Sequence, residues 1–346
     1  MSVERYTALA LQTRCDAVNQ LAKPDARAAM MAAIERIDEE IRGSLILTGP
    51  SVKLVVLPEY FLTAYPVGET IDGWAEKAAI SPGGPEYEAL SALAQKYNIF
   101  LSGNVYETDD NFPGYYFQAS FVIDARGEIV LRYRRLLSMF APTPHDVWDK
   151  YVDLYGLDAI FPVADTELGK LACIASEEIL FPEITRMFAL RGAEVIIQPT
   201  SEVASPEPTP KEIARRARAQ ENLVYVVAAN TAGIYGEGIP SHSVDGMSTI
   251  VDYRGRVLVK ASTGETMTAN AEIDLAALRA YRAKPGMPNY LVRQRLELFA
   301  STYSETSVYA ANSLLDDNGE PVKPERAHFI EMQRATIARL SEKNLI

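Results

Sequence analysis

The stretch LVVLPEY, residues 54–60, is an apolar run that ends in a proline, a glutamate and a tyrosine. Four consecutive apolar residues, two of them β-branched, are typical of a strand that is buried on both faces. Two later stretches have the same design: RYRR, residues 132–135, closes a strand with arginines, and LACIASEEILFPE, residues 171–183, opens from an apolar strand into a serine and two glutamates. The polar residues at these strand ends are the first candidates for a site: Glu59, Arg135 and Ser176.

Strands and helices alternate on both sides of these stretches, which predicts a layered α/β architecture. A long amphipathic helix is predicted after Pro24, with acidic residues on one face. Its apolar face is formed by Met30, Ile34, Ile37 and Ile41. Residues 169–175, 181–191 and 194–198 predict a strand, a helix and a second strand. A basic amphipathic helix is predicted over residues 210–222, ahead of another buried strand.

Two distant stretches of the chain resemble each other. Residues 121–130 and residues 249–258 each contain an apolar run, a short polar turn with a glycine, and a second apolar run. Glycine at that turn position suits a backbone with φ > 0, so both stretches are predicted to form β-hairpins. Two similar hairpins indicate two similar half-sheets packed face to face.

In this order, the three strand-end stretches resemble those of the nitrilase superfamily of carbon–nitrogen hydrolases, and the similarity covers roughly residues 6–300. It includes a helix–Gly-Ala-Glu–strand passage at residues 186–196. The resemblance implies an α/β fold, a four-layer α-β-β-α sandwich of two mixed β-sheets with outer helices. We expect this domain over residues 1–284. Residues 285–346 are expected to form a C-terminal extension, because prolines break the pattern before a last amphipathic helix.

In that superfamily a cysteine attacks an amide or nitrile carbon, a glutamate moves the protons, and a lysine holds the charge that develops on the substrate. Here Glu59 matches the glutamate, while Arg135 and Ser176 stand where the family has its lysine and its cysteine. Serine is a far weaker acid than cysteine and needs a well-placed base. Arginine does not lose its proton in proteins, but it can stabilise an oxyanion. The resemblance implies a divergent hydrolase of a small amide, nitrile or carbamoyl compound, with Ser176 as nucleophile, Glu59 as general base and Arg135 as oxyanion stabiliser.

Four further residues are expected to bind substrate or to support the site: Tyr60, Asp146, Lys150 and Glu178. Many members of the family have a second glutamate in the loop after the lysine, and Asp146 is the nearest substitute in this chain. Lys150, in the same loop, is a candidate for a substitute amine. Glu178 keeps the acidic position two residues after the nucleophile, and we expect it to accept hydrogen bonds structurally. Cys173 is expected to be a buried core thiol.

Two other functions fit the same residues. In one, the chain is a catalytically inactive pseudoenzyme that keeps the pocket and binds a small molecule or a partner protein. In the other, Glu59 acts as a general acid and base without a covalent intermediate. Turnover that survives a Ser176→Ala substitution would favour the second of these.

Composition limits the partners and the compartment. The net charge of −12 disfavours binding to nucleic acid or to an anionic membrane. No apolar run reaches the roughly 18 residues that a membrane span needs, and the N-terminus lacks the features of a signal peptide. Two cysteines are too few for a disulfide framework and suit a cytoplasmic protein. The scattered cysteines and histidines predict no metal site, and no cofactor is expected.

The predicted helix at residues 181–190 carries more apolar residues than one sheet face needs. Such a helix often packs against its symmetry mate across a two-fold axis. We therefore expect a homodimer or a larger homo-oligomer, with the extension at residues 285–346 contacting the partner subunit. The other expected partner is a small-molecule substrate or ligand.

Overall fold

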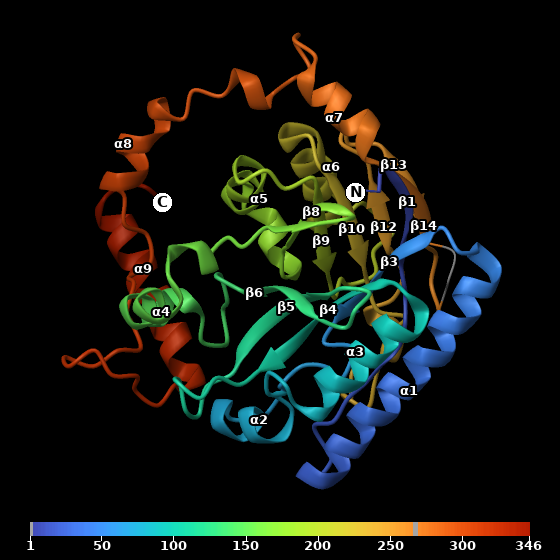
Figure 1. The fold of residues 1–346 in the computed structure, drawn as a ribbon. Helices are drawn as coiled ribbons and strands as arrows, with labels where there is room; N and C mark the ends of the chain where they lie inside the picture. Colours follow the sequence, from blue (N-terminus) through green and yellow to red (C-terminus); the bar gives the residue numbers. More distant parts are fainter. Residues whose placement is uncertain (1–2, 266–268) are drawn as a thin grey trace.

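Two six-stranded β-sheets pack face to face in the computed structural model, which describes residues 3–265 and 269–346 (Figure 1). In order across the first sheet, the strands are β14 (Asn270–Asp274), β1 (Arg5–Ala10), β3 (Val52–Glu59), β4 (Phe100–Glu107), β5 (Phe117–Ile123) and β6 (Ile129–Arg134). Across the second sheet they are β13 (Val257–Lys260), β12 (Thr249–Val251), β10 (Tyr225–Ala229), β9 (Val195–Pro199), β8 (Gly169–Cys173) and β7 (Ala164–Thr166). Each sheet contains parallel and antiparallel pairs, so the prediction of two mixed sheets is confirmed.

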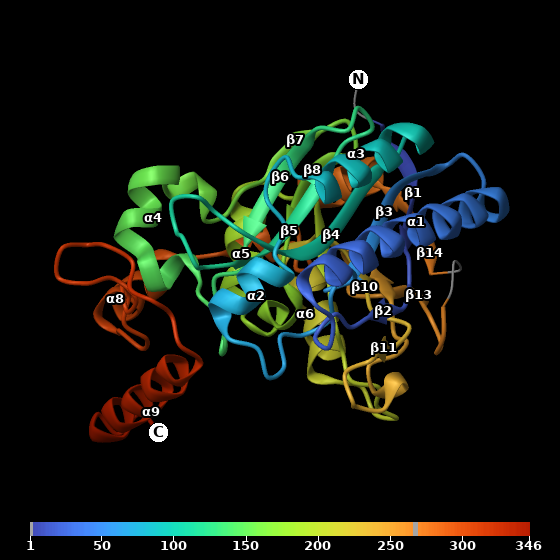
Figure 2. The same cartoon turned by 90° about the horizontal axis from the view of Figure 1, so that it is seen from below.

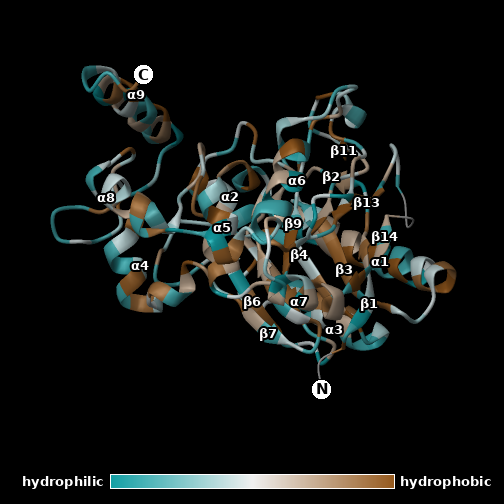
Figure 3. Cartoon of the chain, turned by 90° about the horizontal axis from the view of Figure 1, so that it is seen from above, coloured by the Kyte–Doolittle hydropathy of each residue, from teal (hydrophilic) through white to brown (hydrophobic). Residues whose placement is uncertain are grey.

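Helices cover the outer face of each sheet. Those over the first sheet are α1 (Lys23–Thr48) and α3 (Pro85–Tyr97), and those over the second are α5 (Pro182–Leu190) and α6 (Pro210–Asn222) (Figures 1 and 2). The apolar face predicted for the first long helix is confirmed, because Met30, Ile34, Ile37 and Ile41 are all buried in α1. Figure 3 shows the reason for this layering, since the strands are drawn largely in brown while α1 alternates between brown and teal. Apolar strands are covered on both faces, and amphipathic helices face water on one side.

The remaining elements are short or lie at the edges. A small two-stranded sheet pairs β2 (Cys15–Asp16) with β11 (Ile234–Tyr235). The other α-helices are α2 (Ile71–Lys77), α4 (Trp148–Tyr155), α7 (Leu275–Ala283), α8 (Glu297–Glu305) and α9 (Arg326–Glu342). The 3-10 helices are η1 (Pro144–Val147), η2 (Leu157–Ala159), η3 (Ser176–Leu180), η4 (Ser241–Ser243) and η5 (Leu291–Arg293). No helix in the described part of the chain is long and apolar enough to cross a membrane.

The two predicted hairpins are present, at equivalent edges of the two sheets. One joins β5 to β6 and the other joins β13 to β12. In each turn an aspartate accepts hydrogen bonds from two backbone N–H groups, Asp124 in the first and Asp252 in the second. Gly127 and Gly255 follow at φ 84° and 75°, values that favour glycine. The internal similarity therefore marks the same supersecondary unit in each half.

After α7 the chain leaves the two-sheet body and runs around its side past α4 (Figures 1 and 2). Helix α8 contains no buried residue, and α9 buries Phe329. Backbone hydrogen bonds from Asn312 to the His145 carbonyl and from Leu314 to the Asp146 carbonyl fix this segment beside η1. The domain boundary at residue 284 stays a prediction, but it falls where burial of the chain drops sharply.

The apolar residues of α5 do not all face outward. Phe188 is fully buried and packs against Tyr133 and Phe161, with ring centroids 5.4 and 5.5 Å away. Helix α8 lies alongside α5, where the Tyr303 hydroxyl donates a hydrogen bond of 2.7 Å to Glu183. Part of the apolar surface of α5 is therefore used within the chain, against its own core.

Candidate active site

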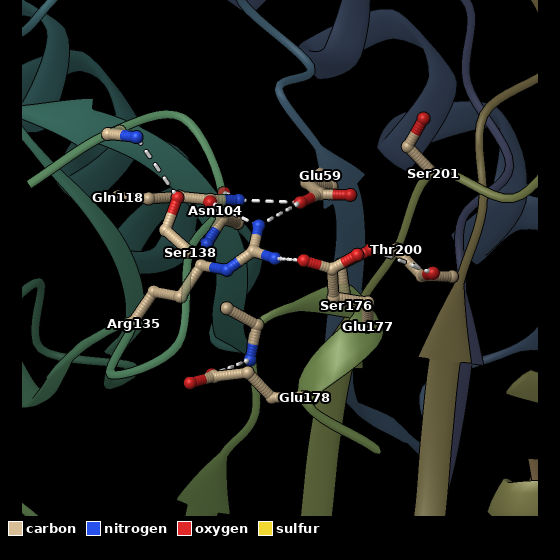
Figure 4. Close-up of polar contacts among 12 residues, drawn as sticks. Glu59, Asn104, Gln118, Arg135, Ser138, Ser176, Glu177, Glu178, Thr200 and Ser201 are labelled. Carbon is tan, nitrogen blue, oxygen red and sulfur yellow. Dashed lines mark hydrogen bonds and ion pairs between the residues drawn. The ribbon is translucent and has the colours of Figure 1, made fainter. Parts of the chain in front are cut away.

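A pocket of about 470 Å³ opens at the ends of β3, β6 and β8, and Glu59, Arg135 and Ser176 all line it (Figure 4). All three side chains are largely buried, with residue exposures of 2, 7 and 3%. The structure thus brings together the three strand-end residues that the sequence singled out. Their catalytic roles remain predictions.

Glu59 is the last residue of β3, and its carboxylate is held by hydrogen-bonded side-chain amides. The register between β3 and β4 shifts between Val56 and Glu59, where Pro58 has no N–H for the ladder. Glu59 Oε1 accepts a 2.5 Å hydrogen bond from Gln118 Nε2, and the same nitrogen donates to Asn104 Oδ1 at 3.0 Å. Because the amide holds one carboxylate oxygen, the orientation of Glu59 is set before any substrate arrives.

Arg135 lies between two carboxylates. Its Nη1 donates to Gln118 Oε1 at 2.8 Å and lies 3.7 Å from Glu59 Oε1, while its Nη2 forms an ion pair with Glu177. Burial alone would lower the pKa of Arg135, but the neighbouring Tyr60 and Glu59 outweigh it and the net shift of the pKa is upward. The guanidinium is a permanent positive charge in the pocket, which suits it to stabilise an anion and not to accept a proton.

Ser176 begins η3 just beyond the end of β8. Its φ of 47° is in the left-handed region, which costs a non-glycine residue on the order of 1 kcal/mol or more. Gln198 Nε2 donates a 2.8 Å hydrogen bond to the Ser176 carbonyl and helps to hold this conformation. A buried serine at a strained bend between a strand and a helix is typical of a nucleophile position.

Lys211 is the functional candidate that the sequence did not reveal. It lies in the first turn of α6, and its Nζ is 2.8 Å from Ser176 Oγ and 3.0 Å from the Ser201 carbonyl oxygen. Burial lowers its pKa below the ordinary value of 10.5, although Glu59 and Glu202 act in the opposite direction. No motif marked this residue, since it appeared as one more cation of a basic amphipathic helix.

Glu178 connects the strand end at Arg135 to the turn at Ser176. Its Oε1 accepts hydrogen bonds from the Leu136 and Leu137 amides at 2.8 and 3.1 Å. Its Oε2 accepts from the Tyr133 hydroxyl at 2.8 Å and from the Ala175 amide at 3.2 Å. Burial raises the pKa of Glu178, against the effect of these donors and of Arg135. These contacts agree with the structural role expected for this residue.

Aromatic side chains form one wall of the pocket. Tyr60, whose φ is 57°, stacks on Tyr106 with ring centroids 5.0 Å apart and contacts Tyr65 edge-on at 5.3 Å. Tyr116 and Phe140 also line the pocket. Tyr60 therefore lies in the pocket, where a supporting role was expected.

The C-terminal extension contributes to the mouth through Arg326. Its guanidinium donates to the carbonyl oxygens of Pro66, Glu69 and Phe140 at 3.0, 2.7 and 3.1 Å. These carbonyls belong to two separate loops on the rim of the pocket, so Arg326 ties the loops to each other. A residue more than 180 positions downstream of both loops was not expected there.

The loop after β6 departs from expectation. Among the residues that the structure describes, neither Asp146 nor Lys150 lines this pocket. Asp146 accepts hydrogen bonds from the Thr143 amide and hydroxyl, as a cap of η1, and from Ser313 of the extension. Lys150 forms a 2.5 Å ion pair with Glu320. Both interpretations as site residues are corrected, because these groups anchor the extension instead.

The described residues give little support to chemistry based on a cysteine thiol or a metal ion. Cys173 is fully buried, and burial raises its pKa to about 12, as expected for a core thiol. No group of three or more histidine, cysteine, aspartate or glutamate side chains suited to a metal ion occurs in residues 3–265 and 269–346. The polar groups that line the pocket include hydroxyls, an amine, carboxylates and guanidinium groups.

Comparison with known proteins gives consistent matches. Residues 17–283 match the family model described as carbon-nitrogen hydrolase. An omega-amidase of Saccharomyces cerevisiae is 26% identical over 261 residues, which cover 75% of this chain and 86% of that protein. An omega-amidase of Mus musculus is 28% identical over 230 residues, 66% of this chain and 79% of that protein. The crystal structure of a carbon-nitrogen hydrolase from Helicobacter pylori superposes with a TM-score of 0.63 at 23% identity, covering 86% of this chain and 98% of that one.

Proposed function

This chain belongs to the carbon–nitrogen hydrolase family, and we propose that it hydrolyses a small amide through a covalent ester on Ser176. As a member of this family it is a hydrolase of carbon–nitrogen bonds other than peptide bonds. The similarity to omega-amidases supports an amide as the substrate, ahead of a nitrile or a carbamoyl compound.

The pocket supports an amide with a small apolar or aromatic acyl group. A volume of about 470 Å³ lies at the small end of the range for ligand sites. The acyl group would lie against Tyr60, Tyr65 and Tyr106, where a flat or apolar group gains contact area. The carbonyl carbon would then reach Ser176 at the polar end of the pocket.

The proposed reaction has two halves. As Ser176 Oγ attacks the amide carbon, its proton passes to a base in the pocket, and Arg135 holds the negative charge that develops on the carbonyl oxygen. The base gives this proton to the leaving nitrogen, the carbon–nitrogen bond breaks, and an ester on Ser176 remains. Glu59 then takes a proton from a water molecule that attacks the ester and passes it to Ser176 Oγ as the carbon–oxygen bond breaks, so that the carboxylic acid leaves and Ser176 is restored. For Arg135 to meet the oxyanion, Glu177 has to give way, because it pairs with the guanidinium in the free protein.

The observation that carries this proposal is the position of Ser176. Its hydroxyl is buried in a pocket, at a strained φ of 47°, with an amine 2.8 Å from Oγ and with Glu59 and Arg135 lining the same pocket. Strain of this kind is unfavourable for stability and is found mainly at functional positions.

The test is hydrolysis of a panel of acetamide, benzamide, phenylacetamide and benzonitrile, followed by ammonia release. We expect wild type to be fastest on the aromatic amides. Ser176→Ala should reduce kcat to background, and Glu59→Gln should reduce it by about 10²–10⁴-fold. Ser44→Ala removes a buried hydroxyl in α1 away from the pocket and should leave kcat unchanged.

Two results would overturn the proposal in different ways. Turnover that persists in Ser176→Ala would exclude the ester and support acid/base chemistry led by Glu59. Wild-type protein that binds the amides without hydrolysing them, by calorimetry, would instead support the pseudoenzyme.

A further inference from the structure

We propose that Lys211 is the base that takes the proton from Ser176 Oγ, so that the nucleophile of this enzyme is a serine–lysine pair. This inference rests on the proposed function, because it concerns activation of the serine that forms the ester. It replaces Glu59 as the base for the first step and leaves Glu59 to act on the water that attacks the ester.

Geometry favours Lys211 over the other groups in the pocket. The side-chain atoms within hydrogen-bonding distance of Ser176 Oγ in the described structure are Lys211 Nζ at 2.8 Å and Thr200 Oγ1 at 3.4 Å. A threonine hydroxyl is no stronger a base than serine itself, whereas a neutral amine is a strong one. The Glu59 carboxylate has its Oε1 engaged by Gln118 and faces Arg135. A general base must lie within about 2.6–3.2 Å of the proton it removes, and Lys211 meets this condition.

The amine must be neutral to act as a base, and the charges around it permit this. Two carboxylates face Lys211, Glu59 from β3 and Glu202 from the loop after β9, and each would favour the ammonium form. Both are already matched by a guanidinium: Arg135 lies 3.7 Å from Glu59, and Arg215 forms a buried ion pair with Glu202. With both carboxylates compensated, burial of the amine decides its protonation and lowers the pKa of Lys211.

The position of Lys211 in α6 acts in the same direction. Thr209 caps the helix through a hydrogen bond from the Glu212 amide, Pro210 is the first helical residue, and Lys211 is the second. The positive end of the helix dipole lies in this first turn and disfavours a cation there. Acidic residues are the common choice at such a position, so a half-buried lysine that contacts a buried serine calls for a functional explanation.

The proton balance of the step is complete within these residues. As Ser176 Oγ bonds to the amide carbon, its O–H bond breaks and the proton moves to the lone pair of Lys211 Nζ. The C=O π electrons move to the carbonyl oxygen beside Arg135. As the oxyanion collapses, the ammonium of Lys211 gives this proton to the leaving nitrogen and the carbon–nitrogen bond breaks. When water later attacks the ester, Glu59 takes a proton from it, and this proton passes to Ser176 Oγ as the carbon–oxygen bond breaks. No oxidant, reductant or cofactor enters the step.

The test compares three substitutions of Lys211 under saturating benzamide. Lys211→Met removes the amine and keeps the length of the chain, Lys211→Arg keeps the charge but not the basicity, and Lys211→Ala leaves space for an added amine. We expect the Met and Arg variants to lose at least about 100-fold in kcat with little change in KM. We expect methylamine to restore part of the activity of Lys211→Ala, with a rate that rises with the concentration of the neutral amine.

The pH profile supplies a second readout. Neutral Lys211 is the active form, so log kcat of wild type should rise with pH and level off above the pKa of Lys211, which lies below 10.5. This rise of log kcat with pH should be absent from the residual activity of Lys211→Met. Lys260→Met is the matched control, because Lys260 also contacts α6, through Glu212 at 2.9 Å, but lies outside the pocket. Its kcat should equal that of wild type.

The outcomes separate this inference from the proposed function. If Ser176→Ala is inactive while Lys211→Arg keeps most of its kcat, Lys211 stabilises charge or positions the serine, and the pair is rejected. If Ser176→Ala is active, the proposed function fails and the pair fails with it. If the unfolding temperature of Lys211→Met differs from that of wild type by more than a few degrees, its kinetics are not used. The rescue of Lys211→Ala by methylamine then decides, and a failure of methylamine to restore activity rejects the serine–lysine pair.

Discussion

Ser176 and its neighbours hold opposite charges in a small buried volume. Arg135 brings a permanent cation to the pocket, Lys211 brings an amine that can take up a proton, and Glu59 and Glu177 bring carboxylates. Such a site is well suited to lower the pKa of an acidic group placed at position 176, because Lys211 can take the proton and the anion that forms is then stabilised by the lysine ammonium and by Arg135. Ser176→Cys therefore tests the local field through a group that titrates in an accessible range.

We expect the thiol introduced by Ser176→Cys to react with iodoacetamide at pH 7 much faster than an ordinary cysteine. Burial raises the pKa of the two native thiols, Cys15 and Cys173, to about 12, so both should stay unmodified. Intact mass should show one adduct on the variant and none on wild type. Adding Lys211→Met should slow the reaction by about tenfold or more, because the amine that takes the proton of the thiol is lost. Equal rates with and without Lys211 would contradict the charge contact described for this pair.

Glu59, Arg135 and Ser176 could be located from the sequence because each directly follows an apolar strand, and strand ends are fixed by the sheet. Lys211 could not be located in this way, because it reaches the pocket from the start of a helix 35 residues after Ser176. The local sequence does not predict which strand end the start of a helix will face. Asp146 and Lys150 were placed wrongly for a related reason. Their partners Ser313 and Glu320 lie about 170 positions away in the extension, beyond the reach of any local pattern.

At the level of elements, the site depends on β6 and η3 keeping their relative positions. Glu178 provides this link with four accepted hydrogen bonds, two from the backbone after β6, one from the Tyr133 hydroxyl in β6 and one from the Ala175 amide before η3. The sandwich itself was predictable, because the apolar strands and amphipathic helices specify layers through their periodicity. The contacts that hold one element against another depend on single buried side chains, and the periodicity of the sequence does not predict which residues make them.

Glu178→Gln should therefore weaken the fold around the site. An amide has one acceptor oxygen, so its NH₂ group would face two donors and leave them unsatisfied. We expect a loss of about 1–3 kcal/mol in the free energy of unfolding, measured by urea denaturation. Glu207→Gln, at an exposed position, is the control and should unfold like wild type. An unchanged midpoint for Glu178→Gln would show that this link is not needed.

At the level of the whole molecule, the extension is the least self-sufficient part of the chain. Helix α8 exposes Leu298, Phe299 and Tyr303, with exposures of 69, 50 and 63%. A helix with this much apolar surface and no buried residue is typical of a segment that packs against a partner. The extension also reaches the pocket through Arg326, so an assembly formed through the extension would be linked to the rim of the pocket.

We expect light scattering at micromolar concentration to give at least twice the chain mass of 38.2 kDa. Leu298→Glu together with Phe299→Glu should lower the mass, because charged groups disfavour a buried apolar contact. Leu47→Glu changes an equally exposed leucine at the end of α1 and should have no effect. A wild-type monomer under these conditions would contradict the expected association.

The central claim is that Ser176 carries the acyl group, and its most direct test is an intact-mass measurement. Glu59→Gln should slow hydrolysis of the ester, and p-nitrophenyl acetate has a leaving group that needs no proton, so acylation can proceed without Glu59. We predict a burst of nitrophenolate equal to the amount of enzyme, one added acetyl group, and its location on Ser176 by peptide mapping. The same experiment with Ser176→Ala, which controls for acetylation elsewhere, should show no burst. A burst that persists in Ser176→Ala, or an acetyl group mapped to another residue, would contradict the account.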